Sequence, residues 1–179
     1  DAWVGSILKT LDSLGVAKNT IVVYNADNGP QNSLWPDGGI TPYRSEKFTN
    51  WEGAYRVPGA VRWPARIAGG TISNEIMSNL DWFPTLLAAA GDPEIKDKLR
   101  KGYRIGGQNY RVHLDGYNQL SLLTGQTNKG ARREFFYFTD GGAVSGLRFG
   151  DWKLVFAEQR GKALGAWQEP MVILSFPKL

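Results

Sequence analysis

The stretch TIVVYNADNGP, residues 20–30, joins an apolar run to an abrupt polar end. Thr20–Ala26 is rich in β-branched and aromatic residues and shows no polar alternation, which predicts a strand covered on both faces. Open α/β folds bind their ligands at the carboxyl ends of such strands. Asp27 and Asn28 follow at that end, and their oxygens suit a hard cation. The stretch therefore predicts a ligand site at the carboxyl end of a sheet.

The residues on either side of this stretch extend the α/β pattern. Residues 4–14 carry apolar side chains at helical spacing, and Gly15 is suited to the left-handed end of a helix. A helix followed by a buried strand is half of a βαβ unit. Val57–Trp63 predicts a second short strand. Asp81 is placed to cap a helix that runs to Ala90, with Leu86, Leu87 and Ala90 on its buried face.

The last third of the chain changes character. Gly91–Gly107 is charged and irregular, and predicts a connector. Short strands separated by glycine and aspartate turns then predict an antiparallel meander. We therefore expect two domains, residues 1–129 as an α/β part and residues 130–179 as an incomplete antiparallel subdomain. The elements expected here are a short helix at Tyr117–Thr124 and strands at Glu134–Thr139, Ala143–Phe149 and Trp152–Ala157.

Composition excludes several classes of function. The 179 residues are 42% hydrophobic, enough for a packed core, and the formal net charge of +4 is too small to indicate a nucleic-acid or membrane surface. There is no cysteine, so no disulfide or thiolate metal site can form. No stretch reaches the length of a membrane span, and the cellular compartment stays open. We expect no nucleic acid and no membrane as partner.

The order of motifs after residue 26 carries a family resemblance. DNGP at 27–30 is followed by Lys47 and, five residues later, by EGAYRVP at 52–58. Together with DWFPTLLAAAG, HLDGYNQLSLLTG, REFFYF and RFGDWKLVF further on, this series resembles the C-terminal portion of arylsulfatases, members of the alkaline phosphatase superfamily. The resemblance covers nearly the whole chain and implies an α/β sulfatase sandwich, partial, with a C-terminal antiparallel sheet.

The resemblance also implies a chemistry and a site. It implies hydrolysis of small-molecule sulfate esters, with Asp27 and Asn28 as metal ligands and Lys47 as the catalytic lysine that contacts the sulfate. The cation it implies is calcium, or alternatively magnesium. Taken alone, an Asp-Asn pair is more often a turn or a cap, and a lone lysine is ordinarily solvated. The strand end and the family spacing together favour the site.

Other residues near the motifs have plainer interpretations. Glu52 and Arg56 are expected to brace the loop through an ion pair, and Gly53 to mark a close backbone approach. Ala54 departs from the second glycine of the family box. His113, the only histidine, is expected to be structural or exposed. Two tryptophans flank the motifs and could line a substrate pocket, namely Trp35 and Trp51.

One family motif is missing from these residues. Sulfatases carry an upstream Cys or Ser in a C/S-x-P-x-R box, which becomes the formylglycine nucleophile, and no serine here has that context. We therefore expect an internal piece of a longer enzyme, inactive alone, that needs its N-terminal half or self-associates. Two alternatives stay open: a phosphodiesterase or phosphonate hydrolase of the same superfamily, and a non-catalytic binding domain.

Overall fold

The computed structural model describes residues 1–31, 39–139, 141–160 and 172–173. The chain groups into two compact units. Unit 1 consists of Asp1–Asn19 and Trp63–Arg133, and unit 2 of Thr20–Arg62 and Glu134–Leu179. Each unit therefore draws on two stretches of sequence. The domain boundary expected between residues 129 and 130 stays a prediction for the whole protein.

Unit 1 begins with the predicted N-terminal helix. Helix α1 spans Ala2–Ser13, and a short 3-10 helix, η1, spans Ala17–Asn19. Gly15 takes a φ of 70° just after the helix, and its N–H donates to the carbonyl of Asp12 at 3.1 Å. A glycine adopts this left-handed conformation without a steric penalty, so the predicted helix end is confirmed.

The next helix differs from the expectation at its start and on its buried face. The 3-10 helix η3 (Asn79–Asp81) leads directly into α3 (Trp82–Ala89). Ser78 caps η3, whereas the side chain of Asp81 makes no cap bond to α3, because it is engaged by Arg132. The predicted buried face was also wrong: Leu86 is 41% exposed. The residues that α3 buries are Pro84, Thr85 and Ala88.

The predicted connector at Gly91–Gly107 is wrong, because this segment is structured. Helix α4 spans Ile95–Lys101 and is followed by a hairpin of β3 (Tyr103–Ile105) and β4 (Gln108–Tyr110). Gly106 and Gly107 form the turn with φ values of 56° and 89°. A two-residue turn with both φ values positive matches the twist of a hairpin. Helix α5 (Leu120–Leu123) is a shorter form of the predicted one.

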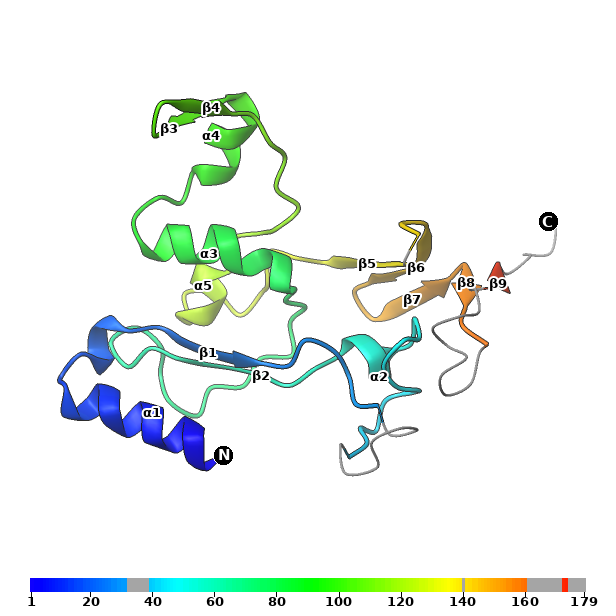
Figure 1. The fold of residues 1–179 in the computed structure, drawn as a ribbon, viewed down its shortest axis with the longest axis horizontal. Coiled ribbons are helices and arrows are strands. Elements are labelled where there is room, and N and C mark those ends of the chain that lie inside the picture. Colours follow the sequence, from blue (N-terminus) through cyan, green and yellow to red (C-terminus); the bar gives the residue numbers. More distant parts are fainter. Residues whose placement is uncertain (32–38, 140, 161–171, 174–179) are drawn as a thin grey trace. The chain divides into compact units, whose positions relative to one another are not determined.

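Unit 2 contains the strand predicted at Thr20–Ala26. Strand β1 spans Val22–Asn25 and pairs with β2, Gly59–Arg62, in antiparallel register (Figure 1). Among the strands that the structure describes, β1 pairs with β2 alone, so these residues contain no parallel neighbour of β1. An apolar run indicates burial but carries no information on strand direction. Tyr24 on β1 is 56% exposed.

The predicted C-terminal meander is confirmed in unit 2. Three antiparallel strands form a sheet in the order β5-β6-β7. Their bounds are Glu134–Phe138, Val144–Phe149 and Trp152–Val155. Two short strands, β8 (Ala157–Glu158) and β9 (Val172–Ile173), pair next to it. The short helix α2 (Glu52–Tyr55) belongs to the same unit, and its Tyr55 ring packs edge-on against the rings of Phe135 and Tyr137.

Candidate functional site

The polar turn after β1 lies in unit 2 together with the other predicted site residues. Asp27 is exposed and Asn28 is half-buried. The side-chain nitrogen of Asn28 donates to the carbonyl oxygen of Gly29 at 2.8 Å. The amide oxygen of Asn28 is its accepting atom and can coordinate a cation. Asp27 and Asn28 thus supply one carboxylate and one amide oxygen, the donor types that calcium prefers.

A tight backbone crossing fixes this turn against the start of α2. The N–H of Gly29 donates to the carbonyl of Ala54 at 2.7 Å. A Cβ on Gly29 would lie 1.7 Å from the carbonyl oxygen of Gly53, and one on Gly53 would lie 1.9 Å from that of Ser45. No side chain fits at either position. The close backbone approach predicted for Gly53 is therefore confirmed, and Ala54 is accommodated in place of the family glycine.

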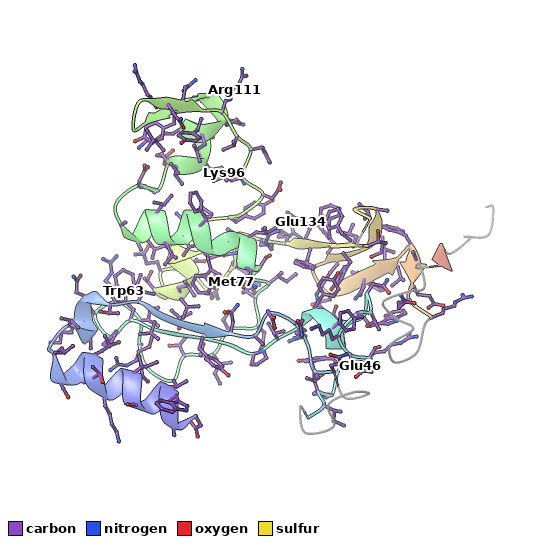
Figure 2. All side chains as sticks on the ribbon, in the orientation of Figure 1. Glu46, Trp63, Met77, Lys96, Arg111 and Glu134 are labelled. Carbon is purple, nitrogen blue, oxygen red and sulfur yellow. The ribbon has the colours of Figure 1, made fainter. Side chains whose placement is uncertain are left out.

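The predicted catalytic lysine lies in the adjoining segment, residues 44–51, which we call the Lys47 loop. The backbone N–H of Lys47 donates to the carbonyl of Pro30 at 2.9 Å, which joins the loop directly to the DNGP turn. Two non-glycine residues of the loop have positive φ, Ser45 at 66° and Phe48 at 74°. Such conformations are strained and persist where the surroundings hold them. Glu46, the neighbour of Lys47 in sequence, marks the position of this loop in Figure 2.

Helix α2 begins at Glu52, and this carboxylate binds three side chains of the C-terminal sheet. Its Oε1 accepts from the Tyr137 hydroxyl at 2.5 Å and from Lys153 Nζ at 3.2 Å. Its Oε2 accepts from Arg148 Nη1 at 2.9 Å. We call these four residues the Glu52 cluster. The ion pair expected between Glu52 and Arg56 was wrong: Arg56 lies over the ring of Tyr43 instead.

Burial and charge act in opposite directions within the Glu52 cluster. Burial by itself would raise the pKa of Glu52, but the Tyr137 hydrogen bond and the charges of Lys153 and Arg148 outweigh it and lower that pKa. Burial lowers the pKa of Lys153, and Glu52 counteracts part of this effect. Burial and the hydrogen bond to Glu52 raise the pKa of Tyr137. The carboxylate is therefore charged and the phenol neutral near pH 7.

A further residue, Asn50, attaches the Lys47 loop to strands β7 and β8. The side chain of Asn50 is fully buried, and its amide donates to the carbonyl of Ala157. The Asn50 carbonyl accepts from Lys153 Nζ at 2.7 Å. The ring of Trp51 lies under the guanidinium of Arg44, with 3.5 Å between the Arg44 Cζ and the ring centroid. Trp51 thus packs within the loop, and Trp35 lies outside the described residues.

Sequence reasoning missed Tyr137, Arg148 and Lys153, although one signal was present. The RFGDWK hairpin places Arg148 directly opposite Lys153 across β6 and β7. Like charges at directly opposed positions repel one another unless an acid lies between them. The pairing therefore called for an acidic partner from elsewhere in the chain, and Glu52 is that partner.

The remaining expectations concern the periphery and possible ligands. His113 is exposed, as predicted, and its Nε2 lies 3.4 Å from a carboxylate oxygen of Asp115. The described part of the chain contains no helix long and apolar enough to cross a bilayer. Within the same residues, no three His, Cys, Asp or Glu side chains gather as a metal group. Asp27 and Asn28 would therefore need oxygen ligands from other residues.

Comparison with known proteins gives a consistent picture. A family model described as Sulfatase matches residues 1–92. Arylsulfatase A of Homo sapiens is 34% identical over 164 residues, covering 89% of this chain and 29% of that protein. Steryl-sulfatase of Rattus norvegicus is 36% identical over 146 residues, covering 77% of this chain and 22% of that protein. N-acetylgalactosamine-6-sulfatase of Mus musculus is 32% identical over 156 residues, 86% of this chain and 26% of that protein.

A solved structure agrees in fold. The chain superposes on the PsFucS1 sulfatase from Pseudoalteromonas sp. with a TM-score of 0.77 and 26% identity, covering 97% of this chain and 32% of that chain. The predicted fold class, a partial α/β sulfatase fold with a C-terminal antiparallel sheet, is thereby confirmed. The chain spans 22% to 32% of the length of these relatives.

Proposed function

This chain belongs to the sulfatase family, and from that premise we propose that it forms part of an arylsulfatase-type sulfuric ester hydrolase. Its relatives are named for aryl, steryl and N-acetylgalactosamine 6-sulfate substrates. These substrates have in common a sulfate group esterified to an organic hydroxyl. The proposed reaction is hydrolysis of a sulfate monoester, which releases the alcohol or phenol and inorganic sulfate.

One observation carries the proposal for this site: the backbone contact between Lys47 and Pro30 at 2.9 Å. It brings the lysine loop onto the turn that bears Asp27 and Asn28, although 19 positions separate Asn28 from Lys47 in sequence. A carboxylate, an amide oxygen and an ammonium are the groups that a site for a cation and a sulfate requires. The backbone bond brings the segment that bears Lys47 beside the turn that bears Asp27 and Asn28, which supports the family assignment of the three residues. The Lys47 ammonium itself lies over the ring of Phe48, with Nζ 4.8 Å from the centroid.

Lys47 is proposed to stabilise charge on the reacting sulfate. Its ammonium has three N–H donors and can hydrogen-bond the non-bridging sulfate oxygens. A donor fixed in place before reaction stabilises negative charge better than water, which must reorganise. The strained Lys47 loop, with Ser45 at φ 66° and Phe48 at φ 74°, supports such preorganisation.

Asp27 and Asn28 are proposed to hold a divalent cation, calcium in the first instance and magnesium as the alternative. When bound, the cation would place positive charge beside the sulfate oxygens. We propose that the remaining oxygen ligands and the formylglycine nucleophile come from a segment of the parent protein outside these 179 residues. The 179 residues expressed alone are accordingly expected to be inactive.

The experiment uses the full-length parent protein and para-nitrophenyl sulfate. Lys47→Ala is expected to lower kcat by about 10²- to 10³-fold, the scale of one lost oxyanion donor. The control is Lys101→Ala, which changes an exposed lysine at the end of α4 in unit 1 and should leave kcat unchanged. Unchanged turnover in Lys47→Ala would remove the lysine from the mechanism. Faster hydrolysis of bis-para-nitrophenyl phosphate than of the sulfate would favour a phosphodiesterase.

A further inference from the structure

We propose that Glu52 is a positioning residue, through which the C-terminal sheet holds the Lys47 loop in its working conformation. The proposal rests on the function proposed above for Lys47. It assigns to Tyr137, Arg148 and Lys153 the task of fixing a loop that lies far from them in sequence. Glu52 itself is not proposed to touch the substrate.

The geometry of the Glu52 cluster supports a fixed carboxylate. Both of its oxygens are engaged, Oε1 by Tyr137 at 2.5 Å and Lys153 at 3.2 Å, and Oε2 by Arg148 at 2.9 Å. The three donors come from three adjacent strands, β5, β7 and β6. A carboxylate held from three directions on a sheet cannot rotate freely, so the position of α2 is defined by the sheet.

The cluster is too well enclosed to be an ordinary surface ion pair. The side chains of Glu52, Lys153 and Arg148 are 21%, 15% and 25% exposed. Lys153 also lies over the Tyr137 ring, with its Nζ 3.7 Å from the centroid. Without the carboxylate, the two cations would face each other across β6 and β7 with no counter-charge. Removal of Glu52 is therefore expected to displace them and the loop that they hold.

The link from the cluster to Lys47 runs through the Lys47 loop. Lys153 bonds both the Glu52 carboxylate and the carbonyl of Asn50, so it holds the loop at its end and at the start of α2. At the other end, the N–H of Gly53 donates to the carbonyl of Arg44 at 2.8 Å and closes the loop. Positive φ at Ser45 and Phe48 has a strain cost that this closure must offset. The Glu52 cluster supports this closure, because it fixes the start of α2 and the Asn50 carbonyl on the sheet.

The test is a double-mutant cycle in the full-length parent protein, read as kcat for para-nitrophenyl sulfate. Glu52→Gln keeps the size of the side chain and removes its charge. It is expected to lower kcat by roughly 10²-fold, because small misplacements of a catalytic group have effects of that size. In a Lys47→Ala background the same change should lower kcat by no more than about twofold, because the group that it positions is already gone.

The cycle separates positioning from general destabilisation. An equal fold-loss from Glu52→Gln in both backgrounds would overturn the proposal, because a purely structural role acts whether or not Lys47 is present. Unchanged kcat in Glu52→Gln would overturn it as well. If Lys47→Ala itself has normal turnover, the proposed function fails and this inference fails with it. If Lys47→Ala is slow and the effects multiply, the inference fails alone.

Two variants guard against loss of folding. Tyr137→Phe removes one hydroxyl and keeps the ring that packs on Tyr55. It should lower kcat severalfold with the same dependence on Lys47, and an effect that does not depend on Lys47 would overturn the proposal. The matched control is Glu158→Gln, which removes an ion pair to Arg160 at 2.8 Å in the same unit. Its kcat should equal that of the unmodified protein.

Discussion

In unit 1, Asp81 binds several of the other buried polar residues. Its side chain is fully buried, and its carboxylate accepts from Arg132 at 2.7 to 3.1 Å. It also accepts from the backbone N–H of Ser78 at 2.9 Å and of Tyr117 at 2.8 Å. Gln119 donates a further bond at 3.2 Å. This single carboxylate thus ties together three segments of the unit, at residues 78–81, 117–119 and 132.

We predict that Asp81→Asn lowers the free energy of unfolding by about 3–5 kcal/mol, because it leaves the Arg132 charge buried without its counter-ion. Urea unfolding of the full-length protein would measure the change. The control is Asp97→Asn, which breaks a pair with Arg100 whose two side chains are 53% and 65% exposed. A loss in Asp81→Asn no larger than in that control would contradict the assigned role.

The same carboxylate should shape the response to acid. Burial would raise the pKa of Asp81, but Arg132 and the backbone donors outweigh it and hold that pKa below the ordinary 3.8. A depressed folded-state pKa gives stability that is fully present above the unfolded value and is lost as pH falls through the folded one. We therefore predict that stability declines below about pH 4, and declines less steeply in Asp81→Asn. Equal acid slopes in thermal melts of the two proteins would refute this.

Metal removal tests the residues at the DNGP turn. We predict that Asp27→Ala raises the calcium concentration needed for half-maximal activity of the full-length protein, because it removes one carboxylate ligand. Activity would be titrated with calcium after chelation and dialysis. Asp12→Ala, a change in α1 of the other unit, should leave the titration unchanged. An unaltered calcium requirement in Asp27→Ala would place the cation elsewhere.

The sequence predicted only those residues of the site that belong to the family series. Asp27, Asn28 and Lys47 were proposed because their order matches a family series, and the close approach at Gly53 followed from its place in that series. The partners of Glu52 were not reached, because Tyr137, Arg148 and Lys153 lie 85 to 101 positions away. A carboxylate in a loop does not indicate which distant strand will supply its donors.

At the scale of elements, local patterns predicted the type of structure better than its pairing. The meander β5-β6-β7 followed from strands separated by turn residues, and α1 from apolar spacing. The antiparallel partner of β1 was missed, since an apolar run is compatible with either direction. The hairpin β3–β4 was missed because its strands have only three residues each, although Gly106-Gly107 is a hairpin signal.

The crossing between the DNGP turn and α2 gives an element-scale prediction. A Cβ on Gly29 would lie 1.7 Å from the carbonyl oxygen of Gly53, so Gly29→Ala must push the two segments apart. We expect a loss of unfolding free energy of about 1–3 kcal/mol or more, as for other overpacked sites. Gly59→Ala in β2 is the control, because a Cβ there meets nothing within 4 Å. Equal melting temperatures for the two variants would contradict the crossing.

At the scale of the whole chain, the apolar surface is large for so small a core. Helix α1 buries none of its residues, and Trp3, Ile7 and Leu14, which share one helical face, are 84%, 57% and 68% exposed. Contiguous apolar surface of this kind marks interaction or aggregation sites. Further exposed large side chains are Tyr24 on β1 and Trp152 on β7.

We predict that the 179 residues expressed alone self-associate at micromolar concentration, because water would otherwise contact these apolar faces. Sedimentation velocity over a concentration series would show species larger than 19.8 kDa. Trp3→Glu should reduce the association by placing a charge on the α1 face. A soluble monomer that unfolds cooperatively would instead favour an independent binding domain.

We propose above that Asp27, Asn28 and Lys47 form one site for a cation and a sulfate. The most direct measurement is a crystal structure of the full-length protein grown with calcium and inorganic sulfate. We predict anomalous calcium density within about 2.3–2.6 Å of the Asp27 and Asn28 oxygens. We also predict a sulfate oxygen about 3 Å from Lys47 Nζ. Calcium bound at other residues, or a Lys47 ammonium turned away from the sulfate, would contradict the proposed site.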